Sequence, residues 1–149
     1  MSGSSRIKVL FLCTGNSCRS QMAEGWTRRL KGDVVKAYSA GIAPKRVDPR
    51  AVAVMAEAGV DLAAHRSKHV DDLADVAFDY VVTVCGHANE HCPVFPGDTK
   101  VVHVGFDDPP KLARDARTEQ EALDIYRRVR DEIRRFVEML PDCLINRAG

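Results

Sequence analysis

The sequence predicts an α/β fold with a single domain, in which helices cover both faces of a four-stranded parallel sheet. Apolar segments typical of strands alternate with segments of helical spacing along most of the 149 residues, and this alternation favours a parallel sheet. The first apolar segment is continuous, as expected of a central strand buried on both faces. We assign residues 1–149 to one domain, since they contain no repeat or linker, and expect residues 1–5 to be disordered.

Four segments have the composition of strands. The first is apolar after Lys8, and the third is rich in β-branched residues. These strands are expected at residues 7–13, 34–40, 80–84 and 100–104.

Three longer segments and one short one are expected to be helical. The first has apolar residues at helical spacing up to Gly32. Asp48 and Pro49 are typical of an N-cap and a first helical residue, and Gly59 of a helix end. A short helix is expected to end near Ala74. Thr118 and Glu121 predict a capping box for the longest helix. Its apolar stripe ends at Pro141 and comprises Ala122, Ile125, Val129, Ile133, Phe136 or Val137, and Leu140.

Charge and composition exclude several classes of protein. The formal net charge is only +1 at pH 7, so we expect neither a nucleic-acid nor a membrane partner. No apolar run approaches the length of a spanning helix, and the first residues lack the apolar region of a signal peptide. We therefore expect a cytoplasmic protein, in which the five cysteines are catalytic or redox-active rather than paired in disulfides.

The segment from Cys13 to Ser20 is expected to bind an oxyanion. It follows a strand and opens a helix, so its backbone N–H groups and the helix dipole favour an anion. Arg19 adds a bidentate, charge-assisted grip, and Cys13 becomes a candidate nucleophile because a positive environment stabilises its thiolate. The alternative is that Cys13 is merely a small buried residue. The expected oxyanion-binding residues are Thr14, Gly15, Asn16, Ser17, Cys18, Arg19 and Ser20.

A second segment carries Cys85 and Cys92, separated by six mostly polar residues. The spacing allows the two sulfurs to meet if the loop rearranges. A zinc site with His87 and His91 is an alternative, although the spacing of these four residues is unusual for zinc. A third possibility is that the two cysteines are buried and unrelated.

The segment Cys13–Trp26, which reads Cys-Thr-Gly-Asn-Ser-Cys-Arg-Ser-Gln-Met-Ala-Glu-Gly-Trp, resembles the signature of the low-molecular-weight protein tyrosine phosphatase superfamily. Within it, the segment is most similar to the thioredoxin-coupled arsenate reductases, because the phosphatases usually have proline in place of Gln21. The resemblance implies that the anion loop follows the first strand. It also implies that the substrate is arsenate, that phosphate and sulfate compete for the site, and that thioredoxin is the partner.

The resemblance assigns roles to three further residues. Cys85 and Cys92 match the second and third cysteines of a relay that begins at Cys13 and passes a disulfide to thioredoxin. Asp108 matches the general acid of an Asp-Pro pair, although adjacent acids before prolines are most often only a turn. Pro110 stands where the phosphatases tend to have an aromatic residue that packs against the substrate.

The resemblance also concerns a potassium site beside the anion loop. Many thioredoxin-coupled members bind the ion with residues that match Asn16, Glu24 and Ser39, together with an acid where this chain has Lys68. We expect the Lys68 ammonium to replace the ion by pairing with Glu24 and bracing Asn16; a solvated surface lysine is the alternative. No metal and no tightly bound cofactor is expected.

These observations predict a monomeric arsenate reductase recharged by thioredoxin. One alternative is a phosphatase, which would need only Cys13, Arg19 and Asp108. A second alternative is a sensor that binds arsenite or a metal without turnover. The phosphatase leaves Cys85 and Cys92 without a role, and the sensor leaves the activated Cys13 and Asp108 without one.

Overall fold

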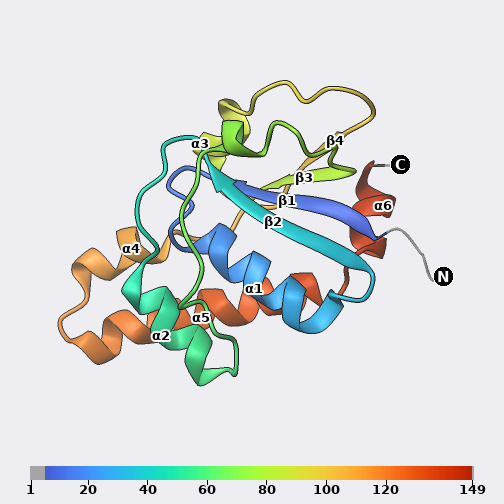
Figure 1. Cartoon of the computed structure of the whole chain (residues 1–149). Helices are drawn as coiled ribbons and strands as arrows, with labels where there is room; N and C mark the ends of the chain where they lie inside the picture. Colours follow the sequence, from blue (N-terminus) through green and yellow to red (C-terminus); the bar gives the residue numbers. More distant parts are fainter. Residues whose placement is uncertain (1–5, 149) are drawn as a thin grey trace.

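The computed structural model describes residues 6–148, and their side chains as far as Asn146; the expected disorder of residues 1–5 lies outside the described residues. Four parallel strands form one sheet with the order β2-β1-β3-β4 (Figure 1). They are β1 (Ile7–Cys13), β2 (Val35–Gly41), β3 (Tyr80–Thr83) and β4 (Lys100–His103). The predicted parallel sheet is confirmed, and the strand ends differ from the prediction by at most one residue. The central β1 is inaccessible from Val9 to Leu12, because it has a strand on each side and covered faces.

Helices cover the sheet on both sides (Figure 1). One side carries α1 (Arg19–Lys31), α2 (Pro49–Glu57) and α5 (Glu119–Val137). In the same view the 3-10 helix η1 (Val70–Leu73) and α3 (Gly86–Glu90) lie on the other side. The remaining short helices are α4 (Pro109–Leu112), the 3-10 helix η2 (Ala113–Asp115) and α6 (Asp142–Ala148).

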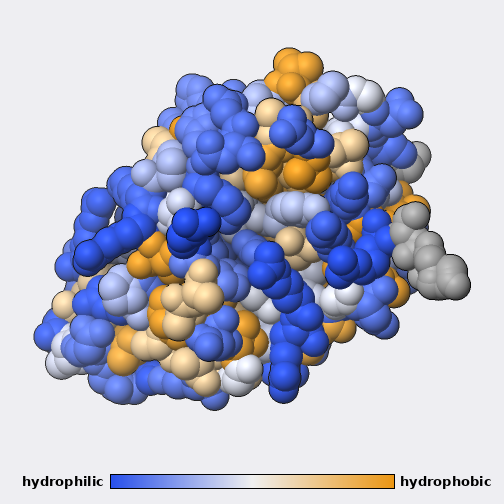
Figure 2. Space-filling model, in the orientation of Figure 1, coloured by the Kyte–Doolittle hydropathy of each residue, from blue (hydrophilic) through white to orange (hydrophobic). Residues whose placement is uncertain are grey.

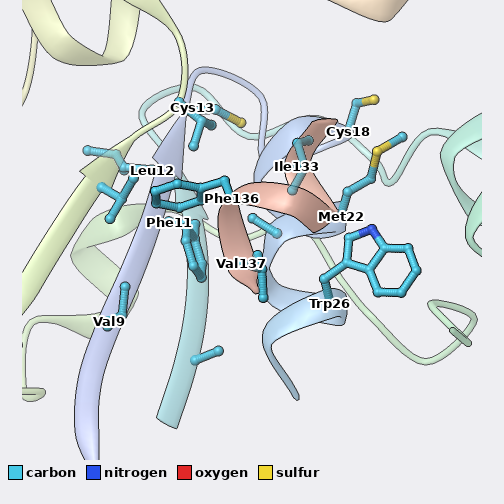
Figure 3. Close-up of a cluster of buried hydrophobic side chains, with 14 of the residues drawn as sticks. Val9, Phe11, Leu12, Cys13, Cys18, Met22, Trp26, Ile133, Phe136 and Val137 are labelled. Carbon is cyan, nitrogen blue, oxygen red and sulfur yellow. The ribbon is translucent and has the colours of Figure 1, made fainter. Parts of the chain in front are cut away.

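The main core lies between the sheet and the pair α1 and α5. Figure 3 shows Phe11 of β1 facing Met22 and Trp26 of α1, with Ile133, Phe136 and Val137 of α5 beside them. The indole N–H of Trp26 donates to the Arg130 carbonyl at 3.2 Å, so this large buried side chain leaves no donor unsatisfied. The packed layer fixes α1, and with it the loop that precedes α1, against the end of β1.

The residues predicted to begin and end α2 do so in the structure. Asp48 accepts from the Arg50 N–H at 2.9 Å at the start of α2, and Gly59 has a positive φ of 85° after its end. The capping box of α5 is only half as predicted. The Thr118 hydroxyl accepts from the Glu121 N–H at 3.1 Å, whereas the Glu121 carboxylate accepts from the N–H of Arg117 instead of Thr118.

The C-terminal region differs from the prediction. The longest helix ends at Val137, and Pro141 precedes a further short helix, α6, which the sequence did not reveal. Leu140 and Leu144 are buried there, so two apolar side chains hold the segment against the molecule. In the predicted apolar stripe of α5, Ile125 is half-buried and Tyr126 is buried in its place.

The visible face in Figure 2 is mostly hydrophilic, with apolar side chains in separate groups. None of the helices in the described part of the chain is both long enough and apolar enough to cross a bilayer.

Candidate active site

The backbone of the anion loop, residues 13–18, is oriented by hydrogen bonds to its carbonyl groups. The loop that follows β2 runs alongside and donates N–H groups to four of them: Ile42 to Cys13, Ala43 to Thr14, Lys45 to Gly15 and Asp48 to Ser17, at 2.8–3.2 Å. In a trans peptide the N–H points away from the C=O. Carbonyls bound on the outside therefore leave the N–H groups of the loop facing inward, as an anion site requires.

Two residues allow this close approach of backbones. A Cβ atom at Gly41 would lie 2.5 Å from the Thr14 carbonyl oxygen, so only glycine fits there. Asn16 has a φ of 49°, in the left-handed region that asparagine tolerates better than most residues. Asn16 is also fully buried, and its carbonyl accepts from the Ser67 hydroxyl at 2.6 Å and the Gln21 side chain at 3.0 Å.

Cys13 lies at the floor of this loop with 4% of its surface exposed. Its Sγ accepts from the Asn16 N–H at 3.2 Å and lies 2.9 Å from the Ser20 hydroxyl. The Asn16 side-chain amide donates to that hydroxyl at 2.8 Å, which leaves the Ser20 hydrogen free to point at the sulfur. Two donors thus converge on the Cys13 sulfur, which is held at the floor of the loop.

The Arg19 side chain is oriented by residues 106 and 108, which follow β4. Its Nη1 donates to the Phe106 carbonyl at 2.9 Å, and its Nη2 lies 3.6 Å from Asp108 Oδ2. The neighbouring Asp107 pairs instead with Arg128 of α5 at 3.0 Å. The two adjacent acids are therefore distinguished by the fold: of the two, only Asp108 lines the same cleft as Cys13.

Cys18 is unsuited to be a nucleophile. Burial, together with nearby Asp48 and Cys13, raises the pKa of the Cys18 thiol well above its usual value. The side chain therefore stays protonated and serves as part of the loop wall.

Cys85 and Cys92 stand at the two ends of α3. Cys85 is the N-cap residue and is buried, and its Sγ lies 3.4 Å from the Thr14 hydroxyl of the anion loop. Cys92 is half-buried, and burial raises its pKa. The ring centroids of His87 and His91 lie 4.3 Å apart with the rings tilted by 46°, but the described residues include no group of three His, Cys, Asp or Glu side chains arranged to hold a metal ion.

The expected Lys68 ion pair is not what the structure shows. Glu24 Oε2 pairs with Arg28 at 2.6 Å, and Glu24 Oε1 accepts from the Ser39 hydroxyl. The Lys68 ammonium donates to the Arg66 carbonyl at 3.2 Å, while its backbone N–H donates to Asn16 Oδ1 at 3.0 Å. Lys68 does brace Asn16, but through its backbone N–H and not through its ammonium. The ammonium does not pair with Glu24, because Arg28 lies one helical turn away on α1 and already pairs with that carboxylate.

Gln21 is a supporting residue whose contacts the sequence did not indicate. It is fully buried, and its amide links the anion loop at Asn16 to the Arg66 carbonyl at 3.1 Å. His65 Nδ1 lies 2.9 Å from Gln21 Oε1, and burial lowers the His65 pKa. The only signal for this role was the glutamine itself, at a position where the phosphatases usually have proline.

Comparisons with known proteins agree with this geometry. The profile of the low molecular weight phosphotyrosine protein phosphatase family matches residues 8–146. An arsenate reductase of Bacillus subtilis is 50% identical over 126 residues, covering 84% of this chain and 88% of the relative. One of Halalkalibacterium halodurans is 49% identical over 125 residues, with the same shares covered.

Solved structures show the same fold. An arsenate reductase of Archaeoglobus fulgidus has a TM-score of 0.68 at 34% identity, covering 89% of this chain and 97% of its own. A thioredoxin-dependent arsenate reductase of Corynebacterium glutamicum has a TM-score of 0.65 at 26% identity, covering 90% of this chain and 61% of its own. The chain therefore belongs to the low molecular weight phosphotyrosine protein phosphatase family and, within it, groups with arsenate reductases.

Proposed function

We propose that this protein reduces arsenate to arsenite through Cys13, Cys85 and Cys92 and is recharged by thioredoxin. The observation that carries the proposal is a second thiol at the edge of the anion site: Cys85 Sγ lies 3.4 Å from Thr14. A phosphatase needs no such thiol. The relatives named as arsenate reductases, one of them thioredoxin-dependent, support the same choice.

The first step joins Cys13 to arsenic. The Cys13 thiolate attacks As(V), and an arsenate oxygen leaves as water after Asp108 supplies a proton. The inward N–H groups and Arg19 hold the remaining oxygens and stabilise their negative charge. Phosphate and sulfate have the same tetrahedral shape and compete for the loop.

The second and third steps transfer the oxidation from Cys13 to the pair Cys85 and Cys92. Cys85 attacks Cys13 Sγ, a disulfide forms, and the electron pair of the S–As bond stays on arsenic, which leaves as As(III). Cys92 then attacks Cys85, so that Cys13 is released as thiolate and a Cys85–Cys92 disulfide remains. The two thiols of thioredoxin reduce this disulfide and are themselves oxidised.

The relay requires α3 to unwind. Seven residue steps at a helical rise would separate Cys85 and Cys92 by roughly 10 Å along the axis, whereas a disulfide needs Cα atoms within about 4.4–6.8 Å of each other. The helix has only five residues, and helices this short have little stability of their own. Rearrangement of this segment is therefore compatible with a rigid sheet and anion loop.

We further propose that the protein works without bound potassium, as a monomer in the cytoplasm. The residues do not fit the ion, since both oxygens of the Glu24 carboxylate are engaged and Arg28 places a cation beside it. Arsenate kinetics and thermal stability should be equal in potassium and tetramethylammonium chloride at the same ionic strength. A lower KM or a higher thermal stability in potassium would contradict this.

The main test follows arsenate-dependent NADPH oxidation with thioredoxin and thioredoxin reductase, beside hydrolysis of an aryl phosphate by the same preparation. We expect repeated arsenate turnover and at most weak phosphatase activity. Aryl phosphate hydrolysis without arsenate reduction would favour the phosphatase. Stoichiometric arsenite binding with neither activity would favour the sensor.

A further inference from the structure

The cleft above the anion loop, about 490 Å³ in volume, is bordered by cations that the proposed chemistry does not use. Lys45 and Arg46 come from the loop between β2 and α2. Lys111 lies in α4 and Arg114 in η2, more than sixty residues along the chain. All four side chains are exposed. Two segments that are distant in sequence thus place the same charge around one opening, which we call the cationic mouth (Lys45, Arg46, Lys111 and Arg114).

The charge of the cationic mouth is not neutralised by the protein. Within residues 6–146 none of its four side chains forms an ion pair. With Arg19, the cleft is lined by five cations against two carboxylates, although the whole chain carries a net charge of only +1. Both carboxylates are engaged: Asp48 caps α2 and accepts from the Tyr126 hydroxyl, and Asp108 lies by Arg19.

The walls of the cleft are unsuited to an aryl ester. Of the described residues that line it, none is aromatic, and Pro49 and Pro110 supply rigid apolar surface. A phenyl ring would find no ring to stack on, whereas a small, multiply charged oxyanion gains from every unpaired cation nearby. A cleft lined by one sign of charge concentrates ligands of the opposite sign and raises their association rate.

We propose that the cationic mouth is a charge filter that captures arsenate and lets arsenite leave, an inference that rests on the proposed arsenate reduction. At neutral pH arsenate is a mixture of monoanion and dianion, whereas arsenite is an uncharged acid. The same four side chains therefore attract the charged substrate, whereas the uncharged product gains no such attraction. Because the four side chains act on the capture of substrate, their removal should lower kcat/KM and leave kcat unchanged.

The test compares two variants that each lose four positive charges. The mouth variant carries Lys45→Gln, Arg46→Gln, Lys111→Gln and Arg114→Gln. The control variant carries Arg29→Gln, Lys31→Gln, Lys100→Gln and Arg135→Gln, at positions that form no ion pair in the described part of the chain and do not line the cleft. At low salt the mouth variant should lose about tenfold in kcat/KM for arsenate, keep kcat and lose most of its dependence on ionic strength. The control variant should keep all three values, and product inhibition by arsenite should be the same in both.

A second measurement does not depend on arsenate reduction. Alkylation of Cys13 by anionic iodoacetate and neutral iodoacetamide should show a rate ratio that favours iodoacetate in the native protein and the control variant, and that falls in the mouth variant. An unchanged ratio, an equal loss of kcat/KM in the control variant, or a matching fall in kcat would overturn the filter. If the native protein forms no arsenite, the proposed function fails, and the alkylation ratio still decides whether the filter exists. Single substitutions give the same comparison if a quadruple variant does not fold.

Discussion

Replacing Arg19 by lysine tests the geometry of the anion site without changing its charge. The guanidinium is 14% exposed and is oriented by the Phe106 carbonyl at 2.9 Å and by Asp108 at 3.6 Å. These contacts direct the planar fork at an oxyanion. A lysine ammonium is a point charge on a flexible stem, so it cannot reproduce two parallel hydrogen bonds.

The expected loss follows from one missing charge-assisted hydrogen bond in the transition state. Such a bond contributes about 1.5–3 kcal/mol, and each 1.4 kcal/mol is roughly a factor of ten in rate. Arg19→Lys should therefore slow the first turnover by about 10- to 150-fold. The Phe106 carbonyl also loses its donor, which should lower the free energy of unfolding by about 1 kcal/mol.

The assay is single-turnover release of arsenite from fully reduced protein, with no thioredoxin present. Arg128→Lys is the matched control, because Arg128 pairs with Asp107 and Glu132 on the exposed side of α5 and does not line the cleft. It should release arsenite at nearly the native rate. A rate for Arg19→Lys within threefold of the native protein would refute the bidentate grip.

Three further predictions follow from the cysteines, the general acid and the buried histidine. Cys92→Ser should release one arsenite per molecule and then stall as a Cys13–Cys85 disulfide visible by mass spectrometry; repeated turnover with thioredoxin alone would rule out the relay. Asp108→Asn should slow the first turnover by roughly 10²–10⁴-fold, and an unchanged rate in rapid-quench measurements would remove Asp108 from the mechanism. Because burial lowers the His65 pKa, the unfolded chain binds more protons below about pH 6.5, and the free energy of unfolding should rise with pH in this range. His65→Gln should reduce this slope in urea titrations between about pH 5 and 7, and an identical slope would show that His65 does not contribute.

Contacts between near neighbours in the chain could be predicted because their partners stand within a few residues. The caps at Asp48 and Thr118 and the end at Gly59 belong to this class, since each uses a hydrogen bond or a backbone conformation set locally. The strand-loop-helix segment around Cys13 is also local, and its resemblance to a known signature supplied the roles of Cys85 and Cys92. The relay itself stays a prediction.

Contacts between distant segments could not be predicted in the same way. The sequence did not indicate that the loop after β2 binds the carbonyls of the anion loop, or that Phe106 orients Arg19 across 87 positions. It also suggested Lys68 as the partner of Glu24, where the turn of α1 brings Arg28 instead. The helix α6 was missed because a segment of seven residues has too weak a pattern of its own.

The sequence by itself determined the fold class and indicated the candidate nucleophile and the kind of ligand, because periodicity and a short contiguous motif encode them. Only the tertiary structure decided which way each functional group faces. Asp107 and Asp108 are adjacent and chemically identical, yet one pairs with Arg128 and the other lies at the cleft. That difference depends on the positions of α5 and α1, which packing against the sheet sets and no local pattern records.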